Sequence, residues 1–121
     1  MSRIAESLAT FGEKFMRRLF TEHEIAYATS SEAQQAARFA KRFAAKEATI
    51  KALNLSHVGL DWKQIEVLRD ESGQCTLALH GVARDAADQA RVEELSVSLS
   101  RDGDYATAMV VAIATQASEE N

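Results

Sequence analysis

Apolar residues near the N-terminus recur every three or four positions with charges between them, which predicts an amphipathic helix. These residues are Ile4, Leu8, Phe11, Phe15 and Leu19. Two capping-box patterns follow this segment. Thr21-Glu22-His23-Glu24 predicts a short helix through Tyr27, and Ser31-Glu32-Ala33-Gln34 predicts a long helix to about Leu53. The first half of the chain is therefore expected to be helical.

The second half has the pattern of strands. A polar segment containing Gly73 separates two short apolar runs and predicts a hairpin loop at residues 70–74. Residues 82–91 are expected to form a short helix, and residues 101–104 a turn between the last two strands. The expected strands are residues 65–69, 75–79, 95–100 and 105–114. Helices followed by antiparallel strands predict an α+β fold, with the helices packed on an antiparallel sheet.

Composition limits the class of protein. At 121 residues the chain is expected to form a single domain over residues 1–121, with a polar tail at about 115–121. No apolar run reaches membrane-spanning length and no signal-peptide pattern occurs. Cys75 is the single cysteine, so an internal disulfide is excluded, and we expect a cytoplasmic protein without a membrane partner. The chain has 18 acidic and 14 basic residues, which argues against general nucleic-acid binding.

Positive charge is concentrated in the long predicted helix. Residues 38–51 contain five Arg or Lys side chains and a single carboxylate, that of Glu47. Glu47 and Lys51 are one helical turn apart and share a face. A carboxylate can hold Mg²⁺ or accept a proton, and an ammonium can bind phosphate, so the pair suits chemistry on a phosphorylated cofactor. The alternative is an ordinary solvated ion pair, but a basic cluster on an acidic chain favours an anionic ligand or partner.

The sequence resembles the holo-acyl-carrier-protein synthase family, the small phosphopantetheinyl transferases. The element Phe-x-x-Lys-Glu-Ala-x-x-Lys occurs at residues 43–51. Other matching segments occur in family order at residues 2–4, 15–21, 24–27, 38–39, 62–67, 70–73, 96–100 and 105–106. The resemblance implies transfer of 4′-phosphopantetheine from coenzyme A to a serine of an acyl carrier protein, with Mg²⁺ as cofactor. It also implies a homotrimer with a site at each subunit interface.

Roles for individual residues follow from the resemblance. It implies that Glu47 is a metal ligand and a candidate base acting directly or through water, and that Lys51 contacts the coenzyme A phosphates. Arg42 and Lys46 match positions expected at the coenzyme A site. Arg101 stands where many members have histidine; it can bind phosphate but cannot act as a base near neutral pH. The family meets its acidic carrier protein on the first helix, which here contains Arg3, Arg17 and Arg18.

Two further departures from the family pattern bear on the site. Members have a strand ending in Gly-x-Asp before the helix that starts here at Arg3, and that Asp is the other main metal ligand. With Glu47 alone, we expect weak Mg²⁺ binding. The usual Gly-Thr-Gly after the long helix is replaced by Asn54-Leu55-Ser56, which is expected to remodel the pocket. Three hypotheses stay open: an active transferase, a non-catalytic relative that binds carrier protein or coenzyme A, and a generic module for acidic partners.

Overall fold

Helices precede strands along the chain, apart from one helix between the two hairpins. The computed structural model describes residues 12–56, 59–102 and 105–115. The first helix in this part of the chain covers residues 12–19. The other elements are α2 (Glu22–Thr29), α3 (Gln35–Ala52), the 3-10 helix η1 (Trp62–Gln64), β1 (Ile65–Arg69), β2 (Cys75–Leu79), α4 (Gly81–Gln89), β3 (Val92–Asp102) and β4 (Tyr105–Ala114). The α+β prediction is confirmed. Within the described residues, no helix is both long and apolar enough to cross a bilayer.

The strands form two antiparallel hairpins. β1 pairs with β2 from Ile65↔Leu79 to Arg69↔Cys75, and β3 pairs with β4 along their whole length. No strand ladder joins the hairpins in the described part of the chain, although β2 and β3 are in contact. The loop at residues 70–74 is confirmed: the Asp70 amide donates to the Gln74 carbonyl at 2.9 Å, and Gly73 adopts φ 89°, a conformation that suits glycine.

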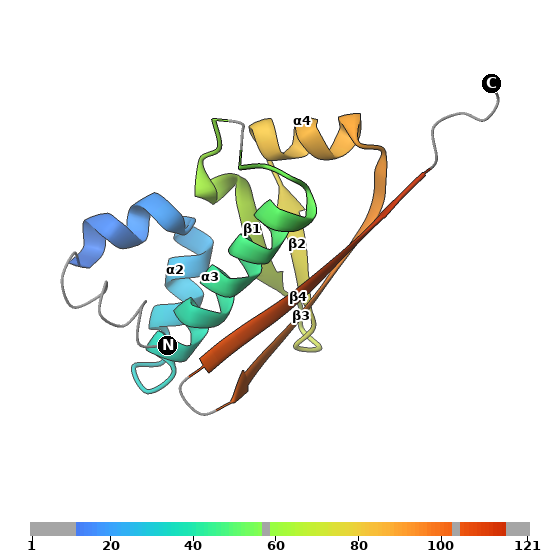
Figure 1. Ribbon diagram of the computed structural model, residues 1–121. Coiled ribbons are helices and arrows are strands. Elements are labelled where there is room, and N and C mark those ends of the chain that lie inside the picture. The colour runs from blue at the N-terminus through green and yellow to red at the C-terminus, as the bar shows by residue number, and fades with distance from the viewer. Residues whose placement is uncertain (1–11, 57–58, 103–104, 116–121) are drawn as a thin grey trace, which may run out of the picture.

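Helix α3 organises the core. It contacts α2, β1, β3 and β4, and Figure 1 shows it between α2 and the long β3–β4 ribbon. On one side, the rings of Phe20 and Phe39 pack at 4.9 Å beside Met16 and Ala28. On the other, Leu55 and Ile65 are buried with Ala83 of α4. The position of α3 decides which of its charged residues face solvent, and therefore where a site can form.

Some predicted boundaries were wrong. Helix α3 begins at Gln35, because the Ser31 hydroxyl caps a turn over residues 32–34, where it accepts from the Gln34 amide at 3.3 Å. β3 is longer than the predicted strand, running from Val92 to Asp102. The predictions that fall on residues 1–11, 57–58, 103–104 and 116–121 lie outside the described residues.

Candidate functional site

The predicted catalytic pair lies near the C-terminal end of α3. Lys51 is exposed in the last turn of the helix and Glu47 is half-buried one turn earlier. The ammonium of Lys51 complements the negative end of the helix dipole. The two residues are therefore accessible together on one face of the helix, as the sequence predicted. An anionic ligand could reach both of them from solvent.

The end of α3 preserves the backbone reversal that a glycine would allow. Asn54 follows the helix with φ 55°, a left-handed conformation that asparagine tolerates better than most residues. The Leu55 amide donates to the Ile50 carbonyl at 2.8 Å and the Asn54 amide to the Lys51 carbonyl at 3.3 Å, which is a Schellman motif. The loss of the family glycine at this position therefore leaves the turn beside Lys51 intact.

Lys46 does not occupy the coenzyme A site that the resemblance implied. Its side chain is 0% exposed and its Nζ lies 2.9 Å from Glu24 Oε1, also 0% exposed. Nζ also donates to the Trp62 carbonyl at 3.1 Å and to the Ile65 carbonyl. Burial lowers the pKa of Lys46, and the nearby carboxylate of Glu24 opposes that shift. Lys46 is enclosed by its partners and cannot reach a ligand from this position.

Glu24 connects three elements. The predicted capping box is present: Glu24 Oε1 accepts from the Thr21 amide at 2.9 Å, and the Thr21 hydroxyl accepts from the Glu24 amide at 3.1 Å. Its second oxygen accepts from the Val67 amide of β1 at 2.8 Å. The sequence indicated the local cap only. The ion pair to α3 and the bond to β1 make Glu24 a structural centre behind the site.

Arg42 lies on the other side of α3 from Lys51. They are nine positions apart in the sequence, which places them about 180° apart around the helix and about 13 Å apart along its axis. Arg42 is 3% exposed, and its guanidinium stacks over the Tyr27 ring, 4.4 Å from the centroid. Burial lowers its pKa. A single copy of α3 therefore does not present Arg42 and Lys51 to the same phosphate group.

The remaining predicted residues are on the surface. Arg17 and Arg18 are exposed on the helix at residues 12–19, where Arg17 pairs with Glu13 at 2.8 Å. Arg101 is exposed near the end of β3, opposite Ala106 of β4. Arg3 lies outside the described residues. The exposed arginines of the first helix remain available to an acidic partner, because a solvent-exposed pair such as Arg17–Glu13 contributes little stability.

The carboxylate of Glu47 can serve as one ligand of a metal ion that a substrate also coordinates. No cluster of three or more His, Cys, Asp or Glu suited to a metal occurs among the described residues. Mg²⁺ is commonly held by one or two carboxylates together with substrate phosphates and water. Glu47 can supply such a carboxylate, and Lys51 places a cation for phosphate one turn away. The described residues alone do not make a complete metal site.

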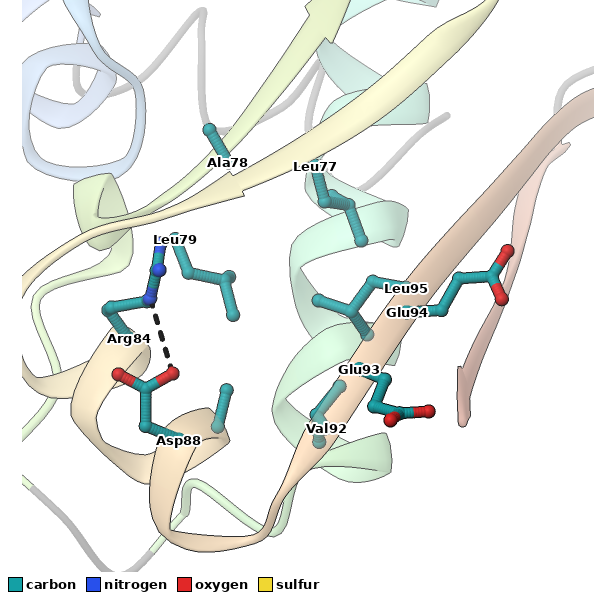
Figure 2. Close-up of a pocket in the computed structure, with 10 residues that line it drawn as sticks. Leu77, Ala78, Leu79, Arg84, Asp88, Val92, Glu93, Glu94 and Leu95 are labelled. Carbon is teal, nitrogen blue, oxygen red and sulfur yellow. Dashed lines mark hydrogen bonds and ion pairs between the residues drawn. The ribbon is translucent and has the colours of Figure 1, made fainter. Parts of the chain in front are cut away.

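A cavity of about 330 Å³ opens between β2, α4 and β3. Figure 2 shows Leu77, Leu79 and Leu95 beside it, with the Arg84–Asp88 pair on α4. That pair is 3.3 Å apart and exposed. None of the predicted site residues lines this cavity, so it is separate from the face that carries Glu47 and Lys51.

Comparison with known proteins places the chain in a family. The family model for the 4′-phosphopantetheinyl transferase superfamily matches residues 1–110. Holo-[acyl-carrier-protein] synthase from Koribacter versatilis is 39% identical over 110 residues, covering 90% of this chain and 87% of the relative. The enzyme of that name from Wolbachia pipientis wMel is 43% identical over 111 residues, covering 90% and 83%.

Solved structures agree with these relatives. The Chronobacterium ammoniagenes synthase in complex with coenzyme A has a TM-score of 0.81 at 31% identity, covering 95% of this chain and 91% of that one. The Helicobacter pylori holo-[acyl-carrier-protein] synthase in complex with coenzyme A has a TM-score of 0.78 at 27% identity, covering 93% and 92%. The fold and sequence together show that the chain belongs to the holo-[acyl-carrier-protein] synthase family of phosphopantetheinyl transferases.

Proposed function

We propose that this protein transfers 4′-phosphopantetheine from coenzyme A to a serine of an apo acyl carrier protein, with Mg²⁺ as cofactor. The observation that carries the proposal is the accessible Glu47–Lys51 pair on α3. It occurs in a chain whose relatives are named for this activity and whose structural neighbours bind coenzyme A.

The serine hydroxyl attacks the phosphorus next to the pantetheine arm, and the bond to 3′,5′-ADP breaks. Glu47 holds the metal or accepts the serine proton, directly or through water. Lys51 binds the diphosphate and opposes its negative charge. Mg²⁺, when bound, supplies further positive charge at the diphosphate. Arg42 binds coenzyme A from the opposite face of α3, and Arg101 is a further candidate for binding its phosphates.

The carrier protein is proposed to dock on the first helix. Arg17 and Arg18 are exposed there and can pair with acidic side chains of a carrier protein. Arg3 belongs to the same proposal, although it lies outside the described residues. An acidic partner fits this surface because the basic side chains are local, whereas the whole chain has a formal charge of −4.

Mass spectrometry of an apo acyl carrier protein tests the proposed activity. Incubation with the chain, coenzyme A and Mg²⁺ is expected to add one phosphopantetheine to the carrier serine and to release one 3′,5′-ADP. Omission of coenzyme A is the control. If the carrier protein binds but neither product forms, the protein is a non-catalytic relative instead.

We further propose that the protein acts as a homotrimer with sites shared between subunits. Two observations support this. Arg42 and Lys51 lie on opposite faces of α3, so a coenzyme A held by both requires two copies of the helix. β4 also presents a row of apolar side chains to solvent, and in soluble proteins such patches commonly mark interfaces. The row is Tyr105 at 73% exposure, Met109 at 67%, Val111 at 46% and Ile113 at 48%.

Mixing two inactive variants tests the shared site. Glu47→Gln and Arg42→Gln are each expected to transfer poorly as pure assemblies. When they are co-expressed with different tags and purified through both, a site with intact Glu47 and intact Arg42 forms between unlike neighbours. After purification through both tags, every trimer contains both variants, and about one third of the sites combine an intact Glu47 with an intact Arg42. Activity no greater than the sum of the two parents would place the whole site within one subunit. If Arg42→Gln does not fold, Arg69→Gln replaces it, because Arg69 of β1 and Arg42 both lie over the Tyr27 ring.

A further inference from the structure

The single cysteine of the chain lies in a cavity lined by cations. The cavity has a volume of about 270 Å³, and the four cationic side chains that line it together with Cys75 are Arg38, Lys41, Arg42 and Arg69. Cys75 is a free, half-buried cysteine, so a small reagent can reach its sulfur from the cavity. We call this space the Cys75 cavity. The proposed transfer reaction makes no use of the thiol.

The strand register holds the thiol beside Arg69. Cys75 begins β2 and pairs directly with Arg69, the last residue of β1. Side chains directly opposite in an antiparallel pair lie on the same face of the sheet, with their Cβ atoms about 4.5–5.5 Å apart. The guanidinium of Arg69 is itself fixed, because it donates to the Tyr27 hydroxyl at 2.7 Å. Positive charge beside an accessible cysteine is typical of thiols that react.

A second observation indicates that the Cys75 cavity lacks an anion. Arg42 is 3% exposed, and its Nε has no hydrogen-bond partner among the described residues. Burial lowers the pKa of Arg42, and negative charge at Cys75 is the first influence that opposes this shift. In the same part of the chain, no carboxylate forms an ion pair with Arg38, Arg42 or Arg69. Buried N–H groups are normally satisfied, so the cavity needs an acceptor that the described residues do not supply.

We propose that Cys75 is a covalent modification site for a small anionic disulfide, a carboxylate-bearing peptide disulfide of the glutathione type, and that the modification blocks the face of α3 that carries Arg42. The Cys75 thiolate attacks one sulfur of the disulfide, a new S–S bond forms as the old one breaks, and the other half leaves as a thiolate. The proton of the Cys75 thiol goes to solvent. Cys75 is oxidised and the departing half is reduced, so the disulfide is the only oxidant required.

Charge favours an anionic reagent at both stages of this reaction. Before bond formation, the cations of the Cys75 cavity raise the local concentration of a carboxylate-bearing disulfide. Afterwards, the carboxylates of the attached half give Arg42 and its neighbours charge-assisted acceptors. A cationic disulfide has neither advantage. Selection by the charge of the reagent is therefore the property that separates this site from an ordinary exposed thiol.

The expected consequence for coenzyme A rests on the proposed function, in which Arg42 binds coenzyme A together with a neighbouring copy. An attached peptide fills the Cys75 cavity and neutralises its cations, so coenzyme A should bind more weakly. An excess of thiol reduces the mixed disulfide and restores binding. Cys75 thereby couples transfer to the ratio of thiol to disulfide around the protein.

Two disulfides of opposite charge test the modification without turnover. Intact-protein mass spectrometry follows the addition of one glutathionyl group from oxidised glutathione, or of one cysteamine group from the cationic disulfide cystamine. Each rate is divided by the rate of that reagent with 2-mercaptoethanol. On this scale, oxidised glutathione is expected to react faster than cystamine with the wild-type protein. Arg38→Gln and Arg69→Gln should each slow oxidised glutathione by about fivefold without slowing cystamine.

Two variants and a salt series control this experiment. Arg84→Gln changes an exposed arginine on α4 and should leave both rates unchanged, whereas Cys75→Ser should accept neither reagent. Added salt should slow oxidised glutathione and not cystamine in the wild-type protein, which tests the charge effect without any substitution. A wild-type protein that oxidised glutathione does not modify overturns the proposal. So do equal rates for the two reagents at every salt concentration.

Coenzyme A binding by the modified protein separates this inference from the proposed function. Calorimetry is expected to show about tenfold weaker binding of coenzyme A after glutathionylation, with full recovery after dithiothreitol. Unchanged affinity overturns the proposed block of α3. Transfer by a protein whose Cys75 does not react leaves the function standing and removes the modification site. Charge-selective modification of a protein that shows no transfer leaves the site standing and removes the function.

Discussion

Replacing Lys46 with methionine is expected to destabilise the fold by about 3–5 kcal/mol. The substitution removes the cation that faces Glu24 while filling a similar space, and both side chains of the pair are 0% exposed. The Glu24 carboxylate would then be buried without a counter-charge, and the carbonyls of Trp62 and Ile65 would lose a donor. Denaturant titration of the variant and the wild type, at one protein concentration, measures the difference in the free energy of unfolding.

Two comparisons isolate the ion pair in this experiment. Lys51→Met changes an exposed lysine on the same helix and is expected to alter stability by no more than about 0.5 kcal/mol. The double variant Glu24→Gln with Lys46→Met removes both charges, so it should be more stable than Lys46→Met alone by about 1–3 kcal/mol. Equal effects of the two lysine substitutions would show that Lys46 is not enclosed as described.

The burial of Lys46 has a signal in the sequence, although its partner does not. At 100° per residue, Lys46 lies on the same side of α3 as Phe39, Phe43 and Ile50. Arg42 shares that face one turn earlier, and a lysine among apolar neighbours needs a buried counter-charge. The adjacent Glu47 and the family motif instead favoured a role for Lys46 in ligand binding. That Glu24 supplies the charge depends on how α2 packs against α3, which no local pattern specifies.

The strands show which features the local pattern can predict. β1, β2 and β4 have the predicted bounds, and each adjoins a predicted turn that contains a glycine. β3 begins three residues before the predicted strand. Its pairing shifts register between Val92 and Glu94, and such an irregularity breaks the alternation on which the prediction relied.

The packing of Arg38, Arg42 and Arg69 over the Tyr27 ring likewise depends on tertiary structure. Arg38 and Arg42 are one turn apart, and the sequence already showed the basic character of their helix. Tyr27 comes from α2 and Arg69 from the end of β1, so only the fold brings them together. Charge patterning predicted an anionic ligand, but it could not separate the residues of one face of α3 from those of the other.

Glu47→Gln is expected to reduce transfer by about 100-fold or more while changing coenzyme A binding much less. The amide keeps the shape of the side chain, but it lacks the negative charge that holds a metal and cannot accept the serine proton. The loss should therefore appear in kcat, with KM for coenzyme A nearly constant. Steady-state kinetics with an apo acyl carrier protein and a calorimetric titration of coenzyme A measure the two effects separately.

Lys51→Ala provides the contrast, because Lys51 is proposed to bind the diphosphate of coenzyme A both in the bound substrate and in the transition state. Its loss should weaken coenzyme A binding as well as turnover. Glu71→Gln, in the exposed loop of the first hairpin, is the matched control for removing one carboxylate. If Glu47→Gln and Lys51→Ala both have small and equal effects, the catalytic centre does not lie on this face of α3. If the Glu47→Gln protein also needs more Mg²⁺ for half-maximal rate, the carboxylate acts through the metal, whereas an unchanged Mg²⁺ requirement would assign it the role of base.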